Sequence, residues 1–146
     1  MSATASVLLR HAESDDDLRA CFPVLKELRP HLNNAAQLVA ALRQQTPQGY
    51  RILAAWEGDQ AKAVAGYRVQ DNLIHGHFLY VDDLATLEQS RSQGLGGKLL
   101  SALEEIAVQQ QCKRLVLDTA LANSRAQRFY FRSGLLARGY HFSVDL

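Results

Sequence analysis

Apolar positions in the chain fall into two kinds of stretch, short runs bounded by polar residues and longer segments in which they recur every three or four positions. The short runs are typical of β-strands. Gly58 and Asp59 separate two of these runs and predict a hairpin, and Asp71 and Asn72 predict a further turn. The predicted strands cover residues 6–12, 50–56, 61–70, 73–86 (as one long strand or two short ones), 113–119, 135–138 and 140–144.

The longer segments predict four helices, two before the central strands and two after them. Ser14 followed by three Asp is a strong helix start, because carboxylates are favoured at the positive end of a helix. Pro23 lies inside the first segment and predicts a break there. The predicted helices cover residues 14–29, 33–45, 94–110 and 123–132. Together the elements predict a mixed α/β fold with one twisted sheet and helices packed on it.

Length and composition narrow the classes of protein. A chain of 146 residues is expected to form one domain, residues 1–146. With 16 basic and 15 acidic residues, the net charge of +1 argues against broad nucleic-acid binding. The apolar run at the start is too short for a signal peptide, and no window approaches the ~20 apolar residues of a membrane span. We therefore expect a soluble cytoplasmic protein with no membrane and no nucleic-acid partner.

The residues that most strongly indicate a binding function lie between positions 86 and 100, in the sequence TLEQSRSQGLGGKLL. An apolar run precedes this stretch and leucines at helical spacing follow it, which predicts a strand, a glycine-rich turn and a helix. The first N–H groups of a helix have no intrahelical partner and lie at its positive end, so such a turn binds phosphate. Arg91 adds a fixed charge and a forked donor.

Two motifs make the chain resemble the GCN5-related N-acetyltransferase (GNAT) family. The first is the run Arg91-Ser92-Gln93-Gly94-Leu95-Gly96, which matches the family pattern Gln/Arg-x-x-Gly-x-Gly/Ala. The second combines Asn123, Ala126, the pair Phe129-Tyr130 and the pair Gly134-Leu135, with Leu135 where the family usually has Phe. The motifs span about residues 80–135, and the order of predicted elements matches over the whole chain.

The resemblance implies a single-domain GNAT-like α/β fold, with a mixed, mostly antiparallel twisted sheet and helices on both faces. It implies acetyl-coenzyme A as the acetyl donor and direct transfer to an acceptor amine. Asn123 would lie near the pantetheine or the reacting carbonyl, and Tyr130 would return a proton to the leaving thiolate. The donor-binding residues that the resemblance implies are Leu84, Ala85, Thr86, Arg91, Ser92, Gln93, Gly94, Leu95, Gly96, Gly97 and Asn123.

Transfer to an amine also requires a base that keeps the amine neutral. Asp82 and Asp83 are expected on opposite faces of the strand before the loop, and Glu88 lies in the loop itself. Each of them could instead be a solvated or hydrogen-bonded carboxylate. We predict a catalytic set of Tyr130, Asp83 and Glu88, and the three carboxylates suggest a cationic acceptor, such as a small amine, a lysine or a peptide N-terminus.

Other readings of the glycine loop fit less well. A dinucleotide-binding fingerprint would need Gly or Ala at Leu99, and too little chain follows Asp118 to complete a doubly wound sheet. A P-loop would need Ser or Thr at Leu99 and Gly at Ser92. A non-catalytic module of the same fold, binding coenzyme A or a protein partner, stays open as an alternative.

Metal binding and disulfide formation are not expected. His75 and His77 alternate along a predicted strand, but no third ligand is suggested nearby. Cys21 and Cys112 are distant in sequence and form no paired-cysteine motif, which suits a reducing compartment. An exposed edge strand is compatible with a homodimer.

Overall fold

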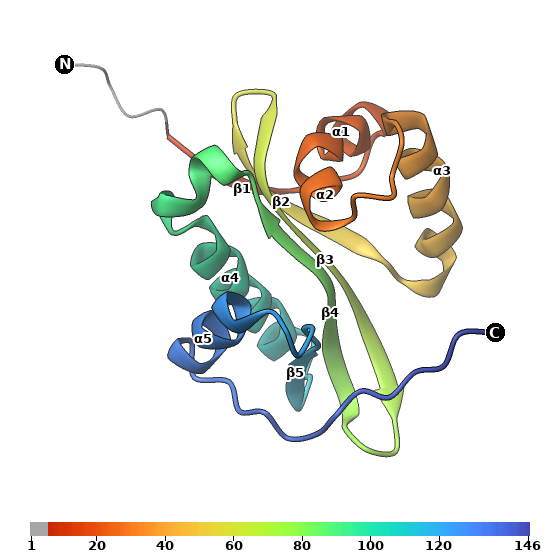
Figure 1. Ribbon diagram of the computed structural model, residues 1–146, viewed down its shortest axis with the longest axis vertical. Helices are drawn as coiled ribbons and strands as arrows, with labels where there is room; N and C mark the ends of the chain where they lie inside the picture. Colours follow the sequence, from red (N-terminus) through yellow and green to blue (C-terminus); the bar gives the residue numbers. More distant parts are fainter. Residues whose placement is uncertain (1–5) are drawn as a thin grey trace. The chain divides into compact units, whose positions relative to one another are not determined.

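The computed structural model describes residues 6–146. Its contacts divide the chain into two compact units, Met1–Val116 and Leu117–Leu146. The first unit contains β1 (Leu8–Ala12), α1 (Asp15–Ala20), α2 (Phe22–Leu28), α3 (Ala35–Gln45), β2 (Arg51–Glu57), β3 (Gln60–Asn72), β4 (Gly76–Thr86), α4 (Leu95–Gln109) and all but the last residue of β5 (Arg114–Leu117) (Figure 1). The second unit contains α5 (Ser124–Arg132).

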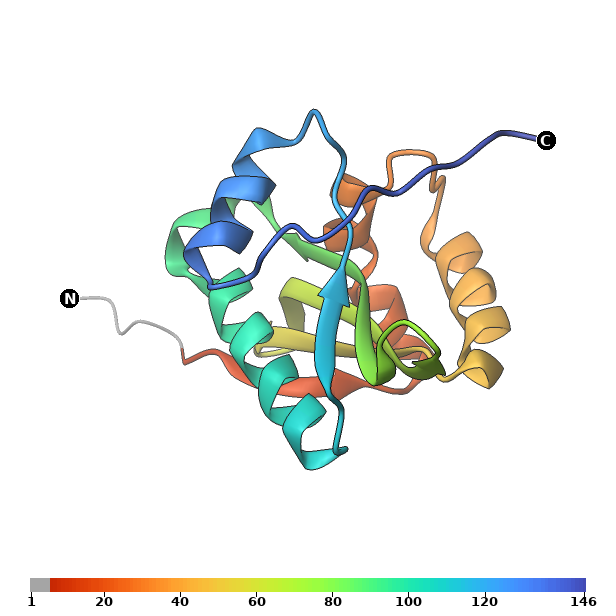
Figure 2. The ribbon, with the colours of Figure 1, turned by 90° about the horizontal axis from the view of Figure 1, so that it is seen from below.

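The sheet has the order β1-β2-β3-β4-β5, and its first four strands pair antiparallel with their sequence neighbours. Helix α4 connects β4 to β5. Helices α1, α2 and α3 lie on one face of the sheet and α4 lies on the other, as the two views in Figures 1 and 2 show. The prediction of a mostly antiparallel sheet with helices on both faces is confirmed.

Local sequence determines the first two helices. The Ser14 side chain accepts a hydrogen bond from the N–H of Asp17, which caps α1 as its sequence predicts. The helix stops at Cys21, and α2 then begins with Pro23 in its first turn. Proline is tolerated there because an N–H at that position would have no intrahelical partner. The predicted break at Pro23 is confirmed, and it divides the segment into two short helices.

Alternate strand residues are buried on the two sides of the sheet. Ile52, Ala54 and Trp56 of β2 belong to the core that also holds Val24 and Leu38 of the first helices. On the opposite face α4 buries Leu95, Leu99, Leu100, Leu103 and Ala107. Both faces of the sheet are therefore covered in its central strands, which explains why their sequences read as nearly continuous apolar runs.

The turn between β3 and β4 lies later than the sequence suggests. β3 continues through Asp71 and Asn72, and the chain reverses at residues 73–75. The Asn72 side chain accepts a hydrogen bond from the N–H of His75, and Gly76 has a φ of 70°. The exposed Leu73 at the tip resembled the start of a strand.

The predictions near the C-terminus are borne out only in part. The strand predicted over 113–119 forms as β5, but it is four residues long and its apolar side chains are half-buried rather than buried. The closing strands predicted over 135–138 and 140–144 do not form, and residues 135–146 carry no regular secondary structure. An alternating pattern produces a strand only where a neighbouring strand takes up its backbone hydrogen bonds.

None of the helices within residues 6–146 has the length and apolar character needed to cross a membrane.

Candidate active site

The glycine loop forms an open helix start at the end of β4. The chain passes through a 3₁₀ turn, Glu88–Gln93, and then through Gly94, whose φ of 70° requires a residue tolerant of the left-handed region. Gly94 is the N-cap of α4 and offers no side chain to cap it. The first intrahelical bond runs from the N–H of Lys98 to the carbonyl of Gly94 at 3.2 Å, so the N–H groups before Lys98 in α4 are left for a ligand.

Space around this helix start is open. A Cβ added at Gly94 or at Gly97 would meet no heavy atom within 4 Å. The Arg91, Ser92 and Gln93 side chains are exposed, so they leave the backbone accessible. Leu95 differs from the other predicted binding residues, because its side chain is buried in the core and only its backbone can face a ligand.

The end of β4 offers a free strand edge beside this loop. Leu84, Ala85 and Thr86 pair with β3 on one side. On the other side, the N–H of Lys113 donates to the carbonyl of His77 at 2.7 Å, near the start of β4. Leu84 lies about 23 Å along the strand from His77, while β5 extends only about 13 Å beyond Lys113. Among the described strands, none lies beside residues 84–86 on that side, so their backbone groups can pair with a ligand.

A β-bulge bends β4 just before this free edge. Gly66 of β3 lies opposite Asp83, but the next residue, Tyr67, lies opposite Val81. Asp82 is therefore the extra residue of the bulge, and such an insertion bends and twists its strand locally. The simple alternation that placed Asp82 and Asp83 on opposite faces does not account for this extra residue.

The Asp83 carboxylate is held from two sides. Arg29 of α2 donates to Oδ1 at 2.9 Å and 3.1 Å, and the Tyr50 hydroxyl donates to Oδ2 at 2.8 Å. Arg29 also donates to the backbone carbonyl of Asp82 at 3.2 Å, which ties α2 to the bulge. Tyr50 is buried against Gly66, so its burial and the neighbouring carboxylate raise the pKa of its hydroxyl well above the usual value. Both oxygens of Asp83 are therefore engaged.

Asp82 forms a separate ion pair. Arg68 donates to its two oxygens at 2.7 Å and 3.0 Å in a bidentate arrangement. Partial burial raises the pKa of the Asp82 carboxyl, and the hydrogen bonds from Arg68 only partly oppose that effect. A raised pKa brings a carboxylate closer to the range in which it accepts a proton from an ammonium group.

Glu88 is the most accessible of the three predicted carboxylates. Its backbone N–H donates to the Glu27 carboxylate of α2 at 3.1 Å and 3.3 Å, which anchors the start of the 3₁₀ turn. Its own carboxylate is exposed and makes no hydrogen bond or ion pair to the described part of the chain. Glu27 therefore positions the backbone here and leaves the Glu88 side chain available.

Two predicted site residues, Asn123 and Tyr130, belong to the second unit. The Asn123 side chain accepts a hydrogen bond from the N–H of Ala126 at 3.1 Å and so caps α5. Tyr130 is partly buried and contacts the Phe129 ring at a centroid distance of 5.3 Å. Burial raises the pKa of the Tyr130 hydroxyl, which keeps it protonated at neutral pH.

The sequence did not single out the residues that position these carboxylates. Arg29, Tyr50 and Arg68 are 14 to 54 positions away from their aspartates in sequence. No local pattern links them, because β-pairing and the packing of α2 bring them together.

Within residues 6–146, no cluster of three or more His, Cys, Asp or Glu side chains is arranged to hold a metal ion. Burial raises the pKa of the Cys21 thiol to about 12, which leaves it unreactive.

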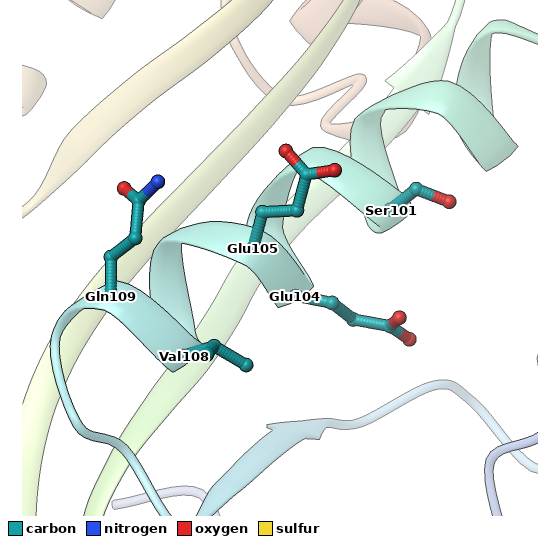
Figure 3. Close-up of a pocket in the computed structure, with 5 residues that line it drawn as sticks. All are labelled: Ser101, Glu104, Glu105, Val108 and Gln109. Carbon is teal, nitrogen blue, oxygen red and sulfur yellow. The ribbon is translucent and has the colours of Figure 1, made fainter.

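A shallow depression lies on the outward face of α4, away from the loop (Figure 3). Glu104 and Glu105 project from neighbouring positions in different directions, and Ser101 marks the end of the depression nearer the loop. Ser101 is already about 9 Å along the helix from Leu95. The depression is open, and we assign it no part in the site.

The fold and the site together define an α/β protein with an uncapped, glycine-rich helix start next to a bent strand with a free edge. Residues 10–135 match the family model described as "Acetyltransferase (GNAT) family", and the chain belongs to that family. The resemblance seen in the sequence is thereby confirmed, and the protein is an acetyl-coenzyme A-dependent N-acetyltransferase that acts on amines.

Relatives agree with the family, and a solved structure agrees with the fold. The chain is 24% identical to the uncharacterized N-acetyltransferase YhdJ of Bacillus subtilis, over 92% of this chain and 95% of the relative. It is 29% identical to a thialysine N-epsilon-acetyltransferase of Bos taurus, over 62% of this chain and 57% of the relative. The fold matches an aminoglycoside N-acetyltransferase, AAC(6')-Iy, in complex with CoA, with a TM-score of 0.84, 15% identity and coverage of 100% of this chain and 98% of that one.

Proposed function

We propose that acetyl-coenzyme A binds with its pyrophosphate on the backbone N–H groups of residues 93–97 and with Arg91 beside it. The observation that supports this proposal most strongly is the uncapped start of α4. Its first N–H groups have no side-chain cap among residues 6–146, lie at the positive end of the helix and border open space at Gly94 and Gly97. An anion there gains hydrogen bonds and charge stabilisation without displacing a side chain.

The pantetheine arm then runs along the free edge of β4. Its amide groups are matched to the unpaired backbone of Leu84, Ala85 and Thr86, in the manner of an added strand. The bulge at Asp82 supports this arrangement, because it bends β4 at the point where β5 no longer accompanies it.

In the transfer step, the acceptor nitrogen attacks the thioester carbonyl and the coenzyme leaves as a thiolate. Tyr130 is the general acid that protonates that sulfur, because its partly buried hydroxyl, whose pKa burial raises, carries a proton at neutral pH. Asn123, whose side chain also caps α5, binds near the pantetheine or the carbonyl.

For the base, Asp82 has the raised pKa and Glu88 has the unengaged carboxylate. Asp82 serves as the base only where Arg68 releases an oxygen, and Asp83 only where Arg29 or Tyr50 does so.

The acceptor class that we propose is a primary amine carried by a small molecule, a lysine or a peptide N-terminus. Relatives whose names specify thialysine and aminoglycosides support amine acceptors. The carboxylates of Asp82 and Asp83 are offset by Arg68 and Arg29, so Glu88 supplies the unpaired negative charge that favours a cationic acceptor. We place the protein in the cytoplasm, with residues 1–146 acting as one catalytic domain.

Calorimetric titration with acetyl-coenzyme A, with NAD as the control ligand, tests the donor site. We expect micromolar binding of acetyl-coenzyme A alone. Gly96→Asp should weaken it at least about tenfold, because a carboxylate within ~4 Å of the pyrophosphate repels it by about 4 kcal/mol at an intermediate dielectric. Gly58→Asp is the matched control, since it adds the same charge in the β2–β3 turn, where a Cβ meets nothing within 4 Å, and since Asp is among the residues that best tolerate the left-handed φ of 61° found there. A preference for NAD, or equal binding by both variants, would reject the site.

A thiol-release assay over a panel of amines separates the enzyme from the non-catalytic alternative. Release of coenzyme A that depends on an added amine supports transfer. Tight donor binding with no release from any amine would instead favour a binding module. A preference for anionic acceptors would contradict the proposed acceptor class while leaving the donor site intact.

A further inference from the structure

The ammonium group of Lys26, in the last turn of α2, holds the chain that follows the helix. Its Nζ donates to the carbonyl of Pro30 and to the carbonyl of Leu32, each at 2.6 Å. A lysine near a helix C-terminus is favourable, because carbonyls there lack an intrahelical donor and carry partial negative charge. Here both acceptors lie beyond the end of the helix, so one side chain holds the connection from α2 to α3 (Figure 1).

Other contacts hold this connection at different points. The N–H of Leu32 donates to the carbonyl of Arg29 at 3.1 Å, and the N–H of Asn33 donates to Oε1 of Gln37 at 2.6 Å. The Leu32 side chain is buried in the core. Removing the Lys26 ammonium would leave two carbonyls without the donor that they have here, and an acceptor that loses its partner destabilises the conformation that presents it. The connection would therefore be free to shift.

Arg29 begins this connection and reaches the bulge of β4. Its backbone, with φ of −122° and ψ of 78°, has left the helical conformation of α2. Its guanidinium donates to the carboxylate of Asp83 and to the backbone carbonyl of Asp82. Burial raises the pKa of the Asp82 carboxyl, and the Arg29 charge is among the groups that oppose this rise. The Arg29 backbone lies between the end of α2 and the chain that Lys26 holds, so Lys26 helps to determine where the guanidinium lies.

From these contacts we infer that Lys26 is a positioning residue for acetyl transfer, which acts through Arg29 to hold the carboxylates of Asp82 and Asp83 where the acceptor amine meets them. The inference rests on the proposed function, because it takes these carboxylates as part of the acceptor side of the site. It gives Lys26 no contact with either substrate. The ammonium is engaged by two backbone carbonyls, and its effect on transfer comes from the geometry that it maintains.

The same helix contacts the donor loop through a different residue. Glu27 accepts hydrogen bonds from the N–H of Glu88 at 3.1 Å and 3.3 Å. Glu27 lies within α2, before the connection that Lys26 holds. A change at Lys26 should therefore disturb the acceptor side and leave the affinity for acetyl-coenzyme A unchanged. This difference separates a positioning role from a general loss of stability.

Steady-state kinetics of Lys26→Met test the inference, with the amine that gives the highest rate in the thiol-release panel as the acceptor. Methionine is also long and unbranched, but it lacks the charge and the donors. We expect kcat/KM for the amine to fall about 10–100-fold, since a misplacement of about 1 Å near a reacting group costs up to about 10²-fold. The Kd of acetyl-coenzyme A should change less than about twofold.

Two further variants serve as rescue and control. Lys26→Arg should restore most of the loss, because a guanidinium keeps the charge and also donates to two carbonyls. Lys113→Met is the matched control, since it removes the same charge from an exposed side chain just before β5, and it should leave kcat/KM unchanged. Circular dichroism and urea denaturation establish that each variant is folded under the assay conditions. Lys26→Gln, which keeps one amide donor, should give an intermediate loss and supplies the same test if the methionine variant does not fold.

A double-mutant cycle with Arg29→Met tests whether Lys26 acts through Arg29. In a protein that already lacks the Arg29 guanidinium, Lys26→Met should lower kcat/KM less than about twofold further. Three results would each overturn the inference and leave the proposed function intact: an unchanged kcat/KM in Lys26→Met, an equally large loss of acetyl-coenzyme A affinity, or full additivity with Arg29→Met. Absence of amine-dependent thiol release from the wild-type protein would instead reject the proposed function, and the inference with it.

Discussion

Replacing Gly66 by Ala is the most direct test of how the site is held in place. An added Cβ would lie 1.8 Å from the Tyr50 hydroxyl oxygen, 2.4 Å from Cζ and 2.9 Å from Cε2. The Tyr50 ring is buried and its hydroxyl donates to Asp83. The ring therefore cannot remain where it is, and its movement breaks the hydrogen bond that holds the Asp83 carboxylate at the bulge of β4.

The cost follows from two effects. Overpacking a dense core costs about 1–3 kcal/mol, and losing a hydrogen bond to a charged group costs about 1.5–3 kcal/mol. The expected loss is about 3–5 kcal/mol of unfolding free energy, which for a chain of this size lowers Tm by roughly 6–15 °C. A loss of that size is a large part of the stability of a typical domain.

Thermal and urea denaturation measure the change, with Gly97→Ala as the matched control. A Cβ at Gly97 meets nothing within 4 Å, and alanine favours a helix over glycine by up to about 1 kcal/mol, so the control should be neutral or stabilising. Tyr50→Leu combined with Gly66→Ala should lose less than the sum of the single changes, because the clash is then absent. A Gly66→Ala protein within about 0.5 kcal/mol of wild type would refute the reasoning.

Three further predictions concern catalysis and pH. Tyr130→Phe should lower kcat about 10²-fold and leave acetyl-coenzyme A affinity unchanged, and equal turnover would mean that water serves as the acid. Each of the three carboxylates can be neutralised in turn, as Asp82→Asn, Asp83→Asn and Glu88→Gln. Only the variant that removes the base should abolish the fall of kcat/KM at low pH. If the dependence of kcat/KM on pH is unchanged in all three variants, none of these residues is the base. Burial lowers the pKa of His11, so the unfolded chain binds its proton more readily, and stability should decline as pH falls below about 6.5. In thermal denaturation at a series of pH values, His11→Gln should reduce this loss of stability. If stability depends on pH in the variant as it does in the wild type, other groups cause the loss.

The elements that the sequence alone determines are those with a local cause. Ser14 caps α1 through the N–H of a residue three positions on, and Gly58 and Asp59 occupy a two-residue turn between β2 and β3. The loop before α4 also depends on local requirements, since Gly94 adopts a left-handed conformation and the helix start after it needs no partner. Each of these features depends on hydrogen bonds or on an apolar spacing within a few residues of the chain. Such features can be recognised in the sequence, as can the family motif.

Only the tertiary structure decided the features with a distant partner. The contact of Tyr50 with Gly66 and Asp83 depends on β-pairing between remote segments and on a one-residue bulge that no alternation predicts. The segment 140–144 has a strand pattern and no strand, because a strand exists only when a neighbouring backbone accepts its hydrogen bonds. Periodicity specifies which faces of an element are apolar, whereas packing and pairing across the fold decide what each face meets.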